Sequence, residues 1–301
     1  MSTASSLAPA LERHLACRAL VEEAASTLLD PLGRQLAAVV QWWELPGLPE
    51  RWPVAVTGTG PPLLLLHGFD SSFLEFRRLV PLLATRHRLV IPDLFGFGFT
   101  PRLPAAATTP AEVLQHLEAL LEALARRESA APVGLIGASM GGAVAVELAR
   151  RSPARIERLL LLAPAGLTGR PMPLPPLLDA LGVRFLARPG VRRGLTRSAF
   201  ASPDRDVGPA ELEIASLHLR TPGWAGSLAR FARSGGFAGC GAPLPPQPLT
   251  VLWGAEDRIL RPPQKRAAQR LLGDRLTELP ACGHLPHLDQ PEAVASHWLH
   301  P

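Results

Sequence analysis

The chain has 301 residues, of which 47% are hydrophobic, and it carries 31 Lys and Arg against 26 Asp and Glu. This length and apolar content are sufficient for one α/β domain with an insertion and a full hydrophobic core. No apolar run approaches the ~20 residues needed to cross a bilayer, so the sequence argues against a membrane-spanning protein. The three cysteines, Cys17, Cys240 and Cys282, are too widely spaced for a metal site and are interpreted as free thiols.

Residues 1–50 are expected to form an N-terminal helical arm. Apolar residues recur there at roughly helical spacing, with an interruption at Pro31 and the aromatic pair Trp42-Trp43 near the end. Such an arm either packs against the rest of the protein or lies on a membrane surface, and packing is the commoner role.

The core is predicted from short apolar runs that alternate with helical patterns. The runs are too short for helices and lie at residues 63–66, 89–92, 133–136, 159–162 and 249–253. The helical patterns lie at residues 73–85, 110–127, 140–151, 262–272 and 291–300. This alternation indicates a mostly parallel sheet covered by helices on both faces.

The segment Gly137-Ala138-Ser139-Met140-Gly141 joins one of these runs to a helical pattern. The spacing predicts a nucleophile elbow, in which a serine sits on a strained turn between small neighbours and projects its hydroxyl above the sheet. The same pattern arises by chance in ordinary turns of a chain with 26 glycines. A serine hydrolase with such an elbow also needs an oxyanion loop upstream, and an acid and then a histidine downstream.

The upstream loop is predicted at His67-Gly68-Phe69, directly after the run at residues 63–66. The backbone N–H of Phe69 would supply one oxyanion donor, and that of Met140, the residue after the serine, would supply the second. His67 is expected to order this loop and not to act as a base.

The acid and the histidine each have one rival. Asp257 follows the run at residues 249–253 and is preferred to its neighbour Glu256, because acidic residues in such turns are commonly solvated. His284 follows a strand-like alternation and a glycine. It is preferred to His287, because the residue nearer the strand end is better placed to reach both of its partners.

Residues 168–247 interrupt the alternation and are expected to form a cap inserted into a core of residues 51–167 and 248–301. Between Arg170 and Arg233 there are ten Arg against five Asp and Glu, so this stretch carries the whole excess charge of the chain, +5. A basic cap could steer an anionic substrate or lie against anionic lipid headgroups. A solvated helical face is an equally good interpretation, because arginine replaces lysine almost throughout this chain. Nucleic-acid binding is disfavoured, since no aromatic platform or recognition motif accompanies the charge.

Over about residues 52–167 and 247–299 the chain resembles the α/β-hydrolase superfamily. The resemblance is carried by His67-Gly68-Phe69, Asp93-Leu94-Phe95-Gly96-Phe97-Gly98, Gly137-Ala138-Ser139-Met140-Gly141-Gly142, Trp253-Gly254-Ala255-Glu256-Asp257 and Gly283-His284. It implies an α/β fold with a doubly wound, mostly parallel sheet and an inserted, mainly helical cap. It also implies a catalytic triad of Ser139, Asp257 and His284, and a structural role for Asp93 in the loop after its strand.

The expected reaction is hydrolysis of a carboxylic ester through an acyl-enzyme on Ser139, with an apolar or amphipathic small-molecule substrate. A serine at the elbow, where other members carry aspartate, argues against dehalogenase and epoxide-hydrolase chemistry. C–C bond hydrolysis and cofactor-free haloperoxidase chemistry stay open, because they use the same triad. A non-catalytic binding role also stays open. No cofactor or metal is implied.

A narrower resemblance covers about residues 63–100. The loops His67-Gly68-Phe69-Asp70-Ser71-Ser72, Leu74-Glu75-Phe76-Arg77-Arg78 and Gly96-Phe97-Gly98-Phe99 are similar to those of chlorophyll dephytylases from oxygenic phototrophs. This similarity implies a long prenyl ester reached at a membrane surface. The N-terminus has acidic residues and no signal-type apolar block, so we expect a cytoplasmic protein, with peripheral membrane contact and oligomeric state left open.

Overall fold

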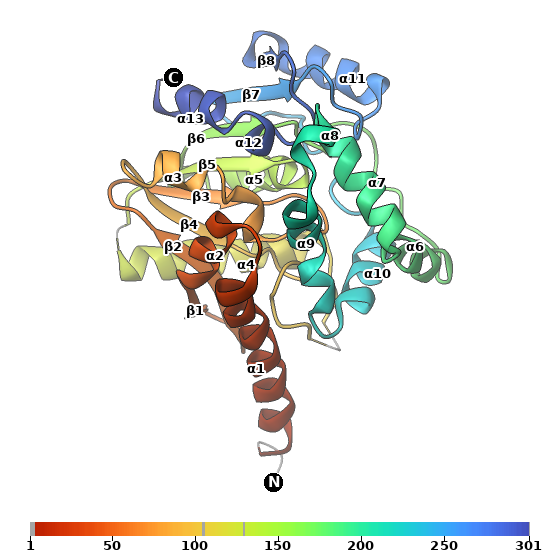
Figure 1. Ribbon diagram of the computed structural model, residues 1–301. Coiled ribbons are helices and arrows are strands. Elements are labelled where there is room, and N and C mark those ends of the chain that lie inside the picture. Colours follow the sequence, from red (N-terminus) through yellow and green to blue (C-terminus); the bar gives the residue numbers. More distant parts are fainter. Residues whose placement is uncertain (1–3, 104–105, 129, 301) are drawn as a thin grey trace.

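The computed structural model describes residues 4–103, 106–128 and 130–300, and an eight-stranded sheet runs through it (Figure 1). The strand order is β1-β2-β4-β3-β5-β6-β7-β8. The strands are β1 (Val40–Glu44), β2 (Arg51–Thr57), β3 (Pro62–Leu66), β4 (Arg88–Pro92), β5 (Val133–Ala138), β6 (Ile156–Leu162), β7 (Leu249–Gly254) and β8 (Leu276–Leu279). The pairs β1–β2 and β2–β4 are antiparallel, and all others are parallel. The predicted mostly parallel α/β sheet is confirmed.

Alternate residues of the central strands face two separate hydrophobic layers, as the pleat of a strand requires. Leu64 and Leu66 of β3 belong to one layer with α4 (Pro110–Arg127) and α5 (Met140–Arg151). Leu63 and Leu65 belong to the other layer with α3 (Val80–Leu83) and α13 (Pro291–Leu299). Both faces of the sheet are therefore covered, which explains why these strands read as continuous apolar runs.

The prediction of a helical arm over residues 1–50 is wrong at its end. Helices α1 (Ala4–Thr27) and α2 (Pro31–Ala38) are present, but Val40–Glu44 forms β1, paired with β2 at the edge of the sheet. The β-branched and aromatic residues of this stretch suit an extended, half-buried strand. Trp43 is buried beneath the guanidinium of Arg127, so it packs within the protein.

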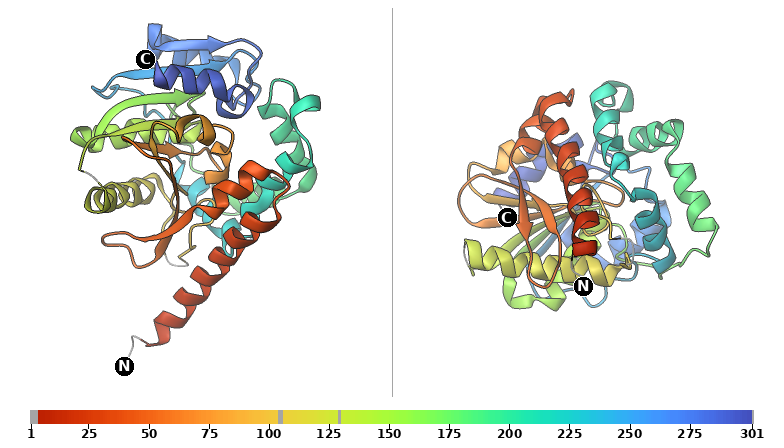
Figure 2. Two further views of the ribbon diagram at one scale, coloured as in Figure 1. Left: turned by 60° about the vertical axis from the view of Figure 1, so that its left-hand side comes forward. Right: turned by 90° about the horizontal axis from the view of Figure 1, so that it is seen from below.

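Helix α1 packs only in part. Cys17, Leu20, Val21 and Ala24 are buried, whereas Leu11 and Leu15 are exposed. Figures 1 and 2 show the N-terminal half of α1 extending away from the sheet. Neither α1 nor any other helix in the described part of the chain is long and apolar enough to span a membrane.

A second difference lies at residues 73–85, predicted as one helix. The structure has a 3₁₀ turn η1 (Phe73–Phe76) and a separate short helix α3. Pro81 at the start of α3 has no N–H to continue the hydrogen-bond ladder from the preceding turn, so the helix is broken there.

Between β6 and β7 the chain leaves the sheet and forms a group of helices, called the cap from here on. They are α6 (Leu178–Leu186), α7 (Pro189–Ala199), α8 (Pro203–Asp206), α9 (Pro209–Leu217), η3 (His218–Arg220) and α10 (Trp224–Ser234). Figure 1 shows them side by side along one edge of the molecule, beside the ends of the parallel strands. The remaining elements are η2 (Pro153–Arg155), α11 (Pro262–Leu272), η4 (Gly273–Arg275) and α12 (Pro286–Asp289).

Candidate active site

Ser139 occupies the turn between β5 and α5 with φ of 50° and ψ of −118°, a backbone conformation that is strained for any residue with a side chain. The glycines around it are required by close packing. A Cβ at Gly137 would lie 2.4 Å from the carbonyl oxygen of Gly141, and a Cβ at Gly141 would lie 2.1 Å from that of Leu66. The tight turn is therefore possible because glycine stands two residues before and two residues after Ser139, as the elbow motif predicts.

The structure brings Ser139, His284 and Asp257 into one hydrogen-bonded series. Nε2 of His284 lies 2.9 Å from Oγ of Ser139, and Nδ1 of His284 lies 2.9 Å from Oδ2 of Asp257. The three residues follow β5, β7 and β8, whose carboxyl ends meet at one edge because these strands are parallel. With Asp257 ionised, Nδ1 carries a proton, so Nε2 is free to accept the proton of the serine hydroxyl.

The carboxylate of Asp257 is held in its charged form by its surroundings. Burial alone would raise its pKa, but the hydrogen bond and charge of His284 and the backbone N–H groups of Leu260 and Ile259 outweigh this and lower the pKa. The indole N–H of Trp253 also donates to Oδ2, at 2.9 Å. A carboxylate fixed by four donors keeps the imidazole in one orientation and one tautomer.

The two rivals lie elsewhere. The side chain of Glu256 is about half exposed and lies 3.6 Å from Arg258. His287 is fully buried, with Nε2 3.0 Å from Oε1 of Glu75 and its ring against Phe76. Neither has a hydrogen bond to the series within the described part of the chain.

The predicted oxyanion loop lies against the elbow. A Cβ at Gly68 would be 3.3 Å from the Cβ of Ser139. The backbone N–H groups of Phe69 and Met140 have no hydrogen-bond partner among residues 4–103, 106–128 and 130–300, and Met140 is the first residue of α5. Both donors are therefore available to a ligand, and the second lies at the N-terminus of a helix, where backbone amides favour negative charge.

His67 orders this loop as a neutral side chain. Its Nε2 accepts a hydrogen bond from the N–H of Leu94 at 3.0 Å, so Nδ1 carries the proton and donates to the carbonyl of Gly68 at 2.8 Å. Burial lowers the pKa of His67 to about 4. Asp93 accepts from the N–H groups of Phe73 and Phe99, each at 2.6 Å, and so fixes the loop after β4.

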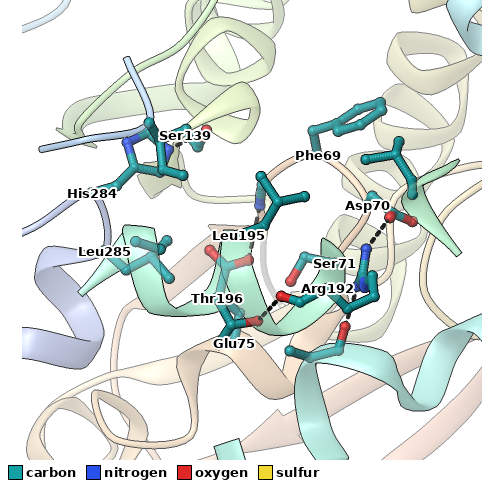
Figure 3. A pocket seen from close by; sticks show the side chains of 15 residues that line it. Phe69, Asp70, Ser71, Glu75, Ser139, Arg192, Leu195, Thr196, His284 and Leu285 are labelled. Carbon is teal, nitrogen blue, oxygen red and sulfur yellow. Dashed lines mark hydrogen bonds and ion pairs between the residues drawn. The ribbon is translucent and has the colours of Figure 1, made fainter. Parts of the chain in front are cut away.

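A cavity of about 380 Å³ opens in front of Ser139 between the core and the cap. Its apolar wall combines Phe69, Ala215, Ile259 and Leu285 with residues from α6 and α7, namely Leu186, Leu195 and Ala199. Figure 3 shows Ser139 and His284 at one side of this space and Asp70 with Arg192 at the other. The cavity is within the size range of small-molecule sites.

Two buried carboxylates at the cavity were missed by the sequence analysis. Asp70, in the oxyanion loop, accepts hydrogen bonds from Trp224 Nε1 at 2.8 Å and from His218 Nε2 at 3.1 Å, and it pairs with Arg192. All three partners come from the cap. Burial would raise the pKa of Asp70, but these partners lower it. This cluster, called the Asp70 clasp, ties the cap to the loop beside the serine. Locally, Asp70 differs from an ordinary loop residue only in its positive φ of 50°, which is unusual outside glycine. A backbone angle cannot be read from the sequence, so this feature gave no signal there.

The second carboxylate is Glu75, whose Oε2 accepts from the N–H of Gly68 at 3.3 Å. Burial opposes its ionisation, but the close contact and charge of His287, together with the hydroxyl of Ser71, lower the pKa of Glu75 to about 2. Glu75 is therefore ionised, and it holds the oxyanion loop in place through the N–H of Gly68. No group of three His, Cys, Asp or Glu side chains in the described ranges is arranged to hold a metal ion.

Comparisons with known proteins agree with this geometry. A model of the alpha/beta hydrolase family matches residues 63–297. The alpha/beta hydrolase domain-containing protein VTE7 of Arabidopsis thaliana is 30% identical over 77% of this chain and 71% of its own length. A 2-hydroxymuconate semialdehyde hydrolase from Pseudomonas sp. strain CF600 is 30% identical over 80% of this chain and 86% of its own.

Solved structures show the same architecture. A thermophilic esterase from Thermogutta terrifontis superposes with a TM-score of 0.67 at 26% identity, covering 86% of this chain and 97% of that one.

Proposed function

The chain belongs to the alpha/beta hydrolase family and is a hydrolase, and on that premise we propose that it cleaves a carboxylic ester through an acyl-enzyme on Ser139. The observation that carries the proposal is the continuous hydrogen-bonded series from Ser139 Oγ through His284 to Asp257, whose first two members line an apolar cavity. Oγ attacks the ester carbonyl while Nε2 of His284 takes its proton, and Asp257 stabilises the resulting imidazolium.

The tetrahedral intermediate carries its negative charge on the former carbonyl oxygen. In our proposal the N–H groups of Phe69 and Met140 bind this oxygen, and His284 then donates its proton to the leaving alcohol. Water, deprotonated by the same imidazole, attacks the acyl-enzyme and releases the acid, which restores the serine hydroxyl. Removal of one such oxyanion donor typically lowers kcat by about 10²–10³-fold in enzymes of this type.

An uncharged apolar or amphipathic ester suits the cavity better than an anionic substrate. Arg192 is the cation on its wall, but the guanidinium already pairs with Asp70 and donates to the carbonyl of Ala215. The neighbouring carboxylate of Glu75 adds negative charge. The remaining wall is largely aliphatic and aromatic, which favours a substrate that buries hydrocarbon.

C–C bond hydrolysis is the second candidate, supported by the similarity to 2-hydroxymuconate semialdehyde hydrolase over 86% of that enzyme's length. The name of its substrate denotes a carboxylate, and no cation is left uncommitted among the described residues that line this cavity. Ester hydrolysis is therefore preferred, and the two reactions can be separated directly.

The test is a comparison of substrates on the purified protein. We expect kcat/KM for p-nitrophenyl esters to rise from acetate to medium chain lengths, with little turnover of 2-hydroxymuconate semialdehyde. Ser139→Ala should lower ester turnover by at least about 10³-fold while the fold is retained. A preference for the semialdehyde would support the second candidate. The proposal would be refuted if the protein turned over neither the semialdehyde nor any of the esters, a long prenyl ester included.

A further inference from the structure

The cap has an exposed apolar surface that the proposed chemistry does not use. Six large apolar side chains with at least a third of their surface exposed fall within 14 consecutive residues. They are Met172, Leu174, Leu177, Leu178, Leu181 and Phe185. This set is called the cap face. Clusters of exposed apolar residues mark interaction sites, whereas single ones do not.

The cap face is part of an ordered helix and not of a loose loop. Leu178, Leu181 and Phe185 are spaced by three and four residues, so they lie along one stripe of α6. The opposite stripe is anchored, because Val183 is buried and Asp179 pairs with Arg233 of α10 at 2.8 Å. Ahead of the helix, the N–H of Leu174 donates to the carbonyl of Ala232 at 3.1 Å. Helix α6 thus turns an apolar stripe outward, and Figure 1 shows it at the outer edge of the molecule.

Around the cap face the charge is positive and uncompensated. Arg170, Arg184 and Arg188 are exposed, and none of them has an ion pair within the described residues. The one acidic residue between positions 168 and 203 is Asp179, which is buried and already paired. The guanidinium of Arg188 also lies 5.8 Å from the ring of Phe185, which brings charge and apolar surface together.

We propose that the cap face docks on a lipid bilayer that contains anionic headgroups. The apolar stripe of α6 would enter the boundary between headgroups and acyl chains, and the three arginines would pair with the phosphates and other anionic groups around it. A second protein surface would bring carboxylates in fixed positions, whereas a bilayer offers diffuse negative charge beside hydrocarbon, which matches scattered arginines around a leucine stripe.

Docking in this orientation brings the bilayer to the cavity. Leu186 directly follows Phe185 and lines the cavity, as does Leu195 of α7, which is itself 42% exposed. The same segment of the cap therefore carries apolar side chains on the cap face and at the space in front of Ser139. In our proposal an amphipathic ester passes from the bilayer to the serine through this part of the cap. This last step rests on the proposed function, but docking can be measured without turnover.

The test is co-sedimentation of the full chain with vesicles of phosphatidylcholine, with and without phosphatidylglycerol. We expect the wild type to bind the anionic vesicles more tightly than the neutral ones. Leu177→Ser/Leu181→Ser/Phe185→Ser should weaken binding by more than about ten-fold, because the apolar contact is lost. Its matched control is Leu11→Ser/Leu15→Ser/Leu29→Ser, three leucines outside the cap that are each more than half exposed, and this variant should bind within about two-fold of the wild type.

The charge contribution is tested separately. Arg184→Gln/Arg188→Gln should weaken binding to anionic vesicles by roughly 30-fold, or about five-fold for each arginine near an anionic surface. Arg266→Gln/Arg270→Gln on α11 removes two exposed arginines that also lack ion pairs with described residues, and it should leave binding unchanged. Unchanged turnover of a short soluble ester confirms that the cap variants are folded.

The proposal is overturned if the wild type does not bind either kind of vesicle, or if the cap variants bind as well as their controls. It is also overturned if the wild type is a dimer that the leucine and phenylalanine substitutions convert to a monomer, since the cap face would then contact a second copy. Vesicle binding in a protein that hydrolyses no ester would refute the proposed function and leave the docking surface intact.

Discussion

The Asp70 clasp gives a prediction whose size follows from burial. In Asp70→Asn the ion pair with Arg192 is lost, while one amide oxygen can still accept from Trp224 or His218. The side chains of Asp70 and Arg192 are only 5% and 11% exposed, so the guanidinium is left largely buried without its counter-ion. Removing one member of a buried pair costs about 3–5 kcal/mol, and the retained acceptor places this variant near 3 kcal/mol.

The assay is urea unfolding at neutral pH with fluorescence of the six tryptophans as the signal. Asp204→Asn is the matched control, because its ion pair with Arg197 is exposed and should cost no more than about 1 kcal/mol. Asp70→Asn/Arg192→Met removes the stranded charge and should recover most of the lost stability. The reasoning is refuted if Asp70→Asn is no more destabilising than Asp204→Asn, or if the double variant is less stable than the single one.

Three further predictions concern the core side of the site. In steady-state kinetics, His284→Ala should abolish ester turnover, whereas His287→Ala should keep most of kcat, because His287 contacts Glu75 and not the serine. The reverse result would exchange the roles of the two histidines. Gly141→Ala should lower the unfolding free energy by about 3 kcal/mol, as at an overpacked core site, because its Cβ would lie 2.1 Å from a backbone oxygen. Gly190→Ala is the control, because the space around its Cβ is open, and it should leave the thermal unfolding unchanged. The pKa of Glu75 is lowered from 4.5 to about 2, so its carboxylate stabilises the fold above pH 4.5 and this contribution is lost as the pH falls toward 2. The wild type should therefore lose stability more steeply over that pH range than Glu75→Gln, and parallel curves would contradict the assignment.

The residues of the serine site could be predicted because each carries a local signal. Ser139 has the glycine spacing of a strained turn, and Asp257 and His284 each follow a short apolar run. Residues that follow parallel strands lie at the same edge of the sheet, whatever the details of packing. The order of the three residues along the chain was therefore sufficient to predict that they meet.

The contacts that join cap to core could not be predicted in the same way. Asp70 is 122 to 154 positions away from its partners Arg192, His218 and Trp224. These side chains share no periodic pattern, and their contact depends on how the cap helices cross above the sheet. The strand β1 was missed for a related reason: a five-residue edge strand after two helices has too short a pattern to outweigh the helical spacing before it.

The net charge of the cap follows from the sequence, but which of its arginines form ion pairs does not. Five of the ten cap arginines are committed to carboxylates, including Arg192 to Asp70 and Arg233 to Asp179. Three exposed arginines without an ion pair among the described residues, Arg170, Arg184 and Arg188, lie on or next to the segment that carries the cap face. Sequence counts give the excess, and only the arrangement of the helices separates the paired arginines from the free ones.

Covalent labelling of Ser139 tests the central claim most directly. A fluorophosphonate should add one phosphonyl group to the wild type, on the peptide that contains Ser139, with loss of ester turnover in proportion to labelling. Ser139→Ala should fold and remain unlabelled. A folded wild type that resists the reagent, or a label that persists in Ser139→Ala, would contradict the assignment of Ser139 as the nucleophile activated by His284.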